Sequence, residues 1–277
     1  MILPKPSSAG STHELGWARA ESWRKIGAIL PLWNYLLLVP AGVGAGISGS
    51  VAGLASLVSY PALLALGLPP VVANVSNTVA LVFGGIGSVS ASRVELAGQA
   101  RRLAPLAVAT ISGGVVGGLL LMRAPAASFT HIVPWLIAGA SAAVLVPRRV
   151  RARTPHRTHT VLLYAGTTLT GVYGGYFGAA SGVLLLALLL ALTDESLPQI
   201  SAARNLLLSL ANVVASAVFI LYGTVNWFAA IPLGVGFFIG GRIGPVITRR
   251  TPTRPLRFVI ALAGLALAVD LAWQAYS

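Results

Sequence analysis

The 277-residue chain contains no cysteine, and only 9% of its residues are charged. Without cysteine the protein forms no disulfide, no thiolate-bound zinc site and no cysteine-ligated iron–sulfur cluster. Soluble domains carry roughly 25% charged residues, whereas this chain is 56% hydrophobic with a mean hydropathy of +0.83. This composition excludes a soluble globular enzyme and a disordered tail, and it indicates a polytopic membrane protein.

Acidic side chains are especially scarce, because six Asp and Glu stand against 19 Lys and Arg, for a net charge of +13. Nucleic-acid-binding proteins can carry a similar excess of positive charge. Here most basic residues lie in short segments between apolar runs, which is the distribution expected of cytoplasmic membrane loops. We therefore expect the lipid bilayer as a partner and no nucleic acid.

Apolar runs divide the chain into membrane segments of about 20 residues or more. The runs cover 26–68, 71–92, 103–122, 128–147, 161–193, 197–222, 227–248 and 256–275. The first and fifth are too long for one span. A basic stretch near the middle, 147–159, holds five arginines. We predict a polar or interfacial segment at 1–25, a transmembrane repeat at 26–147, a basic cytoplasmic linker at 148–160 and a second transmembrane repeat at 161–277.

Three groups of residues recur in the same order in both halves. Gly46, Gly49, Gly53 and Ser56 recur 125 residues later as Gly171, Gly174, Gly178 and Ser181. Pro70 and Asn77 recur 128 residues later as Pro198 and Asn205, and Gly113, Gly114 and Gly117 recur 127 residues later as Gly240, Gly241 and Gly244. A nearly constant offset indicates an internal duplication.

Basic residues at matched loops are exchanged between the halves. The loop after 71–92 holds Arg93, Arg101 and Arg102, whereas its counterpart at 223–226 holds none. The loop before 128–147 holds only Arg123, whereas its counterpart holds four arginines. This exchange favours repeats of opposite orientation. We predict an all-α polytopic membrane protein with two homologous, inverted repeats and 8–10 membrane segments, some of them broken or re-entrant at glycines.

The glycine-rich stretches offer two interpretations. Glycine is a poor helix former, and broken segments at corresponding positions of two halves are a pointer to a transport site. The predicted breaks are at Gly46, Gly49, Gly53, Gly171, Gly174 and Gly178. The alternative is close packing of helices that continue through these glycines.

Uncharged polar residues cluster after each proline helix start. The candidate substrate-binding residues are Asn74, Ser76, Asn77, Thr78, Ser201 and Asn205, together with Ser56 and Ser181 beside the glycines. Ser196 is the expected N-cap of the second of these helices. Helix starts present free N–H groups and a positive dipole end, which suits an anion.

Arg204 is a charged residue inside an apolar run. Its guanidinium suits a sulfonate, sulfite or carboxylate group, which makes it a further candidate substrate-binding residue. The alternative is an arginine near the helix start whose side chain extends to the membrane interface. The sequence indicates no catalytic residue and no metal ligand set.

These stretches resemble the sulfite exporter TauE/SafE family, also called the toluene sulfonate uptake permease family. The resemblance is carried by the glycine-rich segments 46–78 and 171–205, and with the duplicated organisation it covers about 30–275. The sequence departs from the usual run of consecutive glycines in both copies, and the second copy lacks a proline matching Pro61. The resemblance implies a multi-pass permease of the bacterial inner membrane for small sulfur-containing anions, with a site between the repeats, no enzymatic activity and no organic cofactor.

Two other functions stay open from the residues. One is a permease for another small solute, such as a carboxylate. The other is an intramembrane serine protease of the rhomboid kind, in which Ser48 in the sequence GISG would pair with His131. For an anion permease we expect facilitated export without a coupling ion, because an anion leaving a negative interior gains about 2.3 kcal/mol per charge per 100 mV. The alternative is co-transport in which the substrate itself carries the proton.

Overall fold

The computed structural model describes residues 35–145, 156–249 and 254–276, and every regular element in these ranges is a helix. The helices are α3 (Leu38–Ala52), α4 (Ala55–Ala65), α5 (Pro70–Ala91), α6 (Arg93–Leu96), α7 (Ala100–Arg123), α8 (Ala126–Leu145), α9 (His156–Tyr176), α10 (Ser181–Leu192), α11 (Leu197–Tyr222), α12 (Trp227–Thr248) and α13 (Arg254–Tyr276). The predicted all-α class is confirmed. The predicted segment 1–25 and most of the predicted linker lie outside the described residues.

Four described helices are long and apolar enough to cross a membrane: α5, α7, α11 and α12. Three shorter apolar helices, α3, α4 and α10, come from the two runs that are too long for one span. The run 26–68 contains α3 and α4, and the run 161–193 contains α10 and most of α9. The protein is therefore a multi-pass membrane protein with interrupted segments in both halves.

In each of the two glycine-rich stretches, a single glycine marks the point where the helix is interrupted. Gly53 ends α3 with a left-handed backbone (φ +79°), and its N–H donates to the Gly49 carbonyl at 2.8 Å. Gly178, two residues after the end of α9, has φ +76°. Glycine adopts this conformation without steric cost, so these two positions fix the breaks.

The helices continue through the other four glycines of the predicted breaks, Gly46, Gly49, Gly171 and Gly174. At Gly46 an added Cβ would lie 2.7 Å from the Phe237 carbonyl oxygen, and at Gly171 it would lie 2.6 Å from that of Thr110. Close packing therefore explains these two glycines, whereas chain interruption does not.

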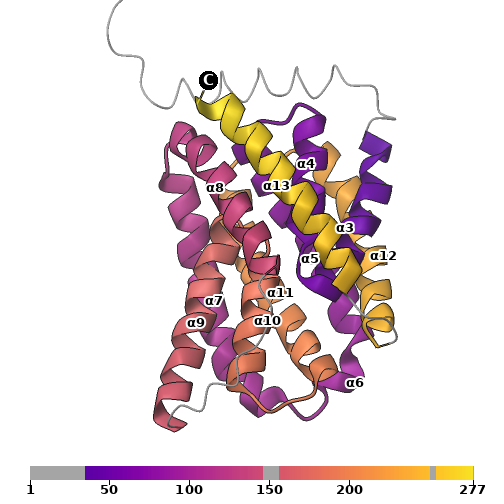
Figure 1. Ribbon diagram of the computed structural model, residues 1–277, viewed down its shortest axis with the longest axis vertical. Coiled ribbons are helices and arrows are strands. Elements are labelled where there is room, and N and C mark those ends of the chain that lie inside the picture. Colours follow the sequence, from indigo (N-terminus) through magenta and orange to yellow (C-terminus); the bar gives the residue numbers. More distant parts are fainter. Residues whose placement is uncertain (1–34, 146–155, 250–253, 277) are drawn as a thin grey trace, which may run out of the picture.

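Helices of the first half pack mainly against helices of the second. α3 packs on α12 and α9 on α7, while α5 packs on α12 and α11 on α7. In Figure 1, α3 begins at the upper end of the molecule and α9 at the lower end, and α4 lies above α10. This mutual arrangement supports an inverted duplication, which stays a prediction.

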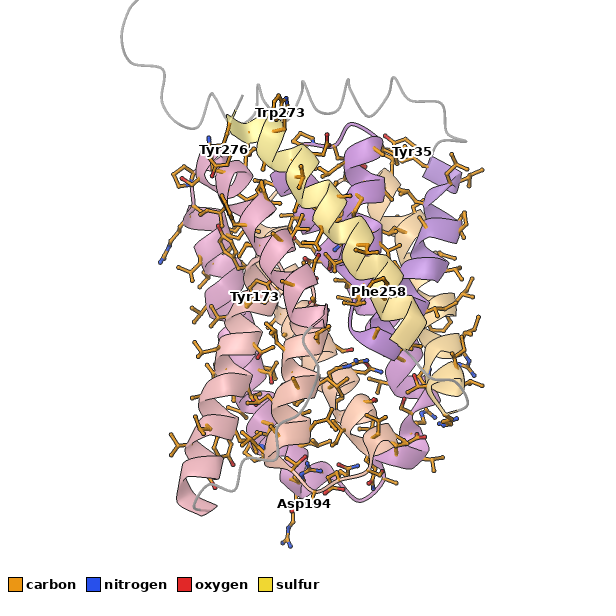
Figure 2. All side chains as sticks on the ribbon, viewed as in Figure 1. Tyr35, Tyr173, Asp194, Phe258, Trp273 and Tyr276 are labelled. Carbon is orange, nitrogen blue, oxygen red and sulfur yellow. The ribbon has the colours of Figure 1, made fainter. Side chains whose placement is uncertain are left out.

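Charged and aromatic residues mark the two ends of the molecule. Figure 2 shows Trp273 and Tyr276 at the upper end, where they are 75% and 60% exposed, and Asp194 at the lower end. Near Asp194 along the chain, Glu195 pairs with Arg102 at 2.8 Å, and this ion pair joins the two halves. Trp and Tyr are enriched at membrane–water interfaces. Since these residues lie at one end of the long axis in Figure 1 and charged residues lie at the other, we expect this axis to be the membrane normal.

Candidate functional site

A cavity of about 80 Å³ lies where the two glycine breaks meet. A Cβ added to Gly53 would lie 2.7 Å from the backbone nitrogen of Val183, so the break after α3 touches the first turn of α10. Residues from both halves line the cavity: Gly46, Gly49, Ser50, Gly53, Ala55, Ser56, Leu81, Gly84, Gly85, Ser88, Gly178, Ser181, Gly182, Asn205, Leu208, Ser209, Asn212 and Phe237. Its polar groups are hydroxyls and amides, and none of these lining side chains is ionisable.

The N-termini of the two short helices face this cavity. Ala55 and Ser56 belong to the first turn of α4, and Ser181 and Gly182 to that of α10. The N-cap residues, Leu54 and Ala180, have apolar side chains that accept no hydrogen bond from the helix. The first N–H groups of a helix lack intrahelical acceptors and carry a partial positive charge, so two positive helix ends converge on the cavity.

The carboxyl ends of α3 and α9, the helices before the two breaks, are instead bound by side chains from the opposite half. On α11, Arg204 Nη2 donates to the carbonyl oxygens of Gly49, at 3.1 Å, and Ser50, in the last turn of α3. On α5, Asn74 Nδ2 donates to the carbonyl of Tyr176, the last residue of α9, at 2.9 Å. The Ser50 and Tyr176 carbonyls thereby gain donors that a helix end does not supply, whereas the Gly49 carbonyl also accepts from the Gly53 N–H.

Arg204 also fixes the side chain next to it. Its Nη2 and Nε donate to Asn205 Oδ1, at 2.6 and 3.2 Å. Because guanidinium nitrogens only donate, this contact assigns the amide oxygen of Asn205 to Arg204 and turns the amide nitrogen away from it. Asn205 lines the cavity, so its N–H₂ group is a donor available there.

Three of the predicted binding residues line the cavity: Ser56, Ser181 and Asn205. Ser201 lines a smaller neighbouring cavity with Asn205. The remaining five, Arg204, Asn74, Ser76, Asn77 and Thr78, are fully buried in helix contacts outside the lining. Their role in substrate binding stays a prediction.

On α5, Asn77 and Ser76 contact neighbouring segments, whereas Thr78 bonds within its own helix. Asn77 accepts a hydrogen bond from Ser59 at 2.6 Å and donates to Ser56 at 3.1 Å, which fixes a lining residue. Ser76 accepts from the backbone N–H of Asn226 at 2.9 Å, and Thr78 donates to the Asn74 carbonyl. Buried polar groups need such partners, so each has a structural reason to be polar.

The anion was expected at the starts of α5 and α11, and the structure puts the cavity elsewhere. Ser196 is the N-cap of α11, as predicted. The α5 and α11 residues in the cavity lining begin only at Leu81 and Asn205, more than one turn after those starts. The helix starts at the cavity are those of α4 and α10.

Four further polar residues line the cavity and were not predicted as binding residues: Ser50, Ser88, Ser209 and Asn212. A signal was available for two of them. Asn205, Ser209 and Asn212 follow the spacing i, i+4, i+7 in an otherwise apolar helix, which places them on one face. Such a stripe in a membrane helix is expected to face a cavity or another helix.

The serine–histidine pairing finds no support in the described contacts. Ser48 Oγ donates to the Ala45 carbonyl of its own helix at 3.0 Å. The ring of His131, on α8, packs against Tyr276 of α13 with centroids 5.3 Å apart. Each side chain thus has a structural contact in its own surroundings.

The chain is similar to membrane transporters along most of its length. It is 26% identical over 82% of its length to the probable membrane transporter protein ORF9 of Sinorhizobium sp, of which 88% is covered. It is 25% identical over 92% of its length to the probable membrane transporter protein YfcA of Escherichia coli K12, of which 96% is covered. No solved structure matches the chain.

The family model described as sulfite exporter TauE/SafE matches residues 38–271, which extend from the first described helix to the last. This range contains both glycine breaks and every residue of the cavity lining. Membership of a transporter family points to transport rather than catalysis. The chain belongs to the TauE/SafE sulfite exporter family.

Proposed function

We propose that this membrane transporter is a permease for a small sulfur oxyanion, sulfite or a short organosulfonate, and that the cavity at the glycine breaks is its binding site. The observation that carries the proposal is that the starts of α4 and α10, neither of which has a side-chain cap, face one cavity. Helix N-termini bind anions through their N–H groups and their dipole. The family name adds weight to sulfite as the substrate.

The electrostatics of the surroundings favour an anion further. Arg204 adds a buried positive charge and occupies carbonyl oxygens at the negative end of α3. Among the lining residues no carboxylate opposes an anion. Hydroxyls of Ser56, Ser181 and Ser209 and the amide nitrogen of Asn205 can donate to oxyanion oxygens.

The size of the cavity favours the smallest members of the class. One water-sized position takes about 10–15 Å³, so 80 Å³ holds roughly five to eight such positions. Sulfite or methanesulfonate fits this space, whereas an aromatic sulfonate needs a wider cavity. We propose export as the direction, since an anion leaving a negative interior gains about 2.3 kcal/mol per charge per 100 mV.

The proposal can be tested by measuring the flux of labelled sulfite, methanesulfonate and acetate in proteoliposomes. We expect wild-type flux of sulfite, and at least a tenfold loss in Asn205→Asp, because the substitution replaces a donor with a carboxylate oxygen at the cavity. A tenfold loss corresponds to about 1.4 kcal/mol. The matched control is Asn226→Asp, at the N-cap of α12, where either side chain accepts the Ala229 N–H.

Sulfite flux in Asn226→Asp should stay within about twofold of wild type, since Asn226 is not a lining residue. Undiminished sulfite flux in Asn205→Asp would overturn the site. Acetate flux without sulfite flux would support the carboxylate permease and end the proposal of a sulfur oxyanion.

A further inference from the structure

A smaller cavity of about 10 Å³ adjoins the main one. Ser50 and Asn205 line both cavities and therefore form the partition between them. The smaller cavity also has hydroxyls from Ser92, Ser201 and Thr248 in its lining, and one water-sized position fills it. Its other lining residues include Glu95 of α6, at the lower end of the molecule (Figure 1).

Arg204 forms hydrogen bonds with both residues of this partition. Its guanidinium donates both to the Ser50 carbonyl and to Asn205 Oδ1. The Ser50 hydroxyl in turn donates to the Gly46 carbonyl at 2.7 Å and to the Gly241 carbonyl at 3.3 Å. The partition thus joins α3, α11 and α12.

An ion pair between the two halves borders the smaller cavity. Arg249, directly after α12, places Nε and Nη2 each 2.7 Å from Glu95 Oε1, and Nη2 also donates to the Ala91 carbonyl at 3.0 Å. The side chains of Glu95 and Arg249 are 14% and 39% exposed, so the pair lies between the cavity and solvent. The cavity is closed at this end by groups of opposite charge.

The two oxygens of Glu95 are in different situations. Oε1 receives both nitrogens of Arg249, whereas Oε2 is buried and accepts no hydrogen bond from the described residues. A buried carboxylate oxygen without a donor is unfavourable, so burial of Glu95 weakens the closed arrangement. The Arg249 side chain is 39% exposed, and contact with solvent weakens an ion pair, so Arg249 can exchange Glu95 for another anion.

We propose that the Glu95–Arg249 ion pair is the gate of a passage that leads from the main cavity, past Ser50 and Asn205, to the lower end of the molecule in Figure 1. In the open state Arg249 releases Glu95 and takes the passing anion as its partner. The proposal rests on the proposed function in one respect: the main cavity is the substrate site.

The absence of cysteine provides a direct test. Ser209→Cys places one thiol in the main cavity, and its labelling by a membrane-impermeant thiol reagent reports access from each side of oriented vesicles. We expect slow labelling from the Glu95 side in the reporter alone. Adding Glu95→Gln should raise this rate at least tenfold and leave labelling from the opposite side unchanged.

Glu195→Gln is the matched control, because Glu195 forms the other ion pair between the halves, with Arg102 at 2.8 Å, and lines neither cavity. It should leave the labelling rate within about twofold. Arg249→Gln should reproduce the effect of Glu95→Gln, and the exchanged pair Glu95→Arg with Arg249→Glu should restore slow labelling.

Equal labelling with and without Glu95→Gln, or an equal rise in Glu195→Gln, would overturn the gate. If Glu95→Gln does not fold, the Arg249→Gln and exchanged-pair variants decide the question by the same readout. Labelling needs no substrate, so a failure of sulfite transport and a failure of the gate are distinguishable.

Discussion

At the scale of single residues, Arg204 shows how burial changes the meaning of a charge. Its side chain is fully buried, and it binds two carbonyls of α3 and the amide oxygen of Asn205. We interpret it as a positioning residue that sets the electrostatics of the cavity and the orientation of Asn205. Nη2 contacts all three oxygens, and Nε adds a second hydrogen bond to Asn205 Oδ1, which the single nitrogen of a lysine cannot supply.

We therefore expect Arg204→Lys to lower the thermal unfolding midpoint in detergent by several degrees. Hydrogen bonds to charged groups contribute about 1.5–3 kcal/mol, and lysine restores only part of them. Arg242→Lys is the control, because Arg242 is an exposed arginine of α12. An unchanged midpoint in Arg204→Lys combined with lost sulfite flux would mean that Arg204 binds substrate directly.

At the scale of elements, the interruption of the long segments depends on one glycine in each stretch. Gly53 combines a left-handed backbone with contact to α10. Gly67, between α4 and α5, has nearly the same φ, +77°, but nothing lies within 4 Å of a Cβ added there. Comparing substitutions at Gly67 and Gly53 therefore separates the cost of a left-handed backbone from the cost of a steric contact with α10.

Gly67→Ala should lower the free energy of unfolding by about 1–2 kcal/mol, the cost of a left-handed alanine. Gly53→Ala should cost clearly more, since its methyl group would lie 2.7 Å from Val183 N. Thermal unfolding of the two variants in detergent measures the difference. Equal effects would mean that the breaks do not need the close contact of α3 and α10.

At the scale of the whole molecule, the arrangement predicts opposite sides for matched loops. Ala65 lies at the end of α4 and Asp194 in the loop after α10, and both are exposed. In an inverted duplication these positions face opposite sides of the membrane, and in a parallel duplication they face the same side. The arginines near Asp194 make its end the expected cytoplasmic side.

Single-cysteine variants Ala65→Cys and Asp194→Cys test this topology in a chain with no other thiol. An impermeant thiol reagent should label Ala65→Cys in intact cells and Asp194→Cys only in inside-out vesicles. Wild type, which has no thiol, gives the background. Labelling of both positions from one side would exclude the inverted arrangement.

The fold was more predictable from the sequence than the site. Apolar runs of about 20 residues determine membrane helices by themselves, because lipid offers the backbone no hydrogen-bonding partner. Proline and Ser196 marked the start of α11 correctly, since capping is a local property. In contrast, Ser50 and Ser88 became lining residues only through helix packing, and their sequence neighbours give little sign of it.

The sequence by itself determined the membrane class, most of the helices and the two glycine-rich stretches in which a break was one of two interpretations. Only the tertiary structure decided that Gly53 and Gly178 are the breaks, that α4 and α10 start at the cavity, and that Arg204 binds α3. The physical reason is distance along the chain: the Arg204–Gly49 hydrogen bond joins residues 155 positions apart. Local patterns set which segments form helices, and packing between distant segments sets which polar groups meet.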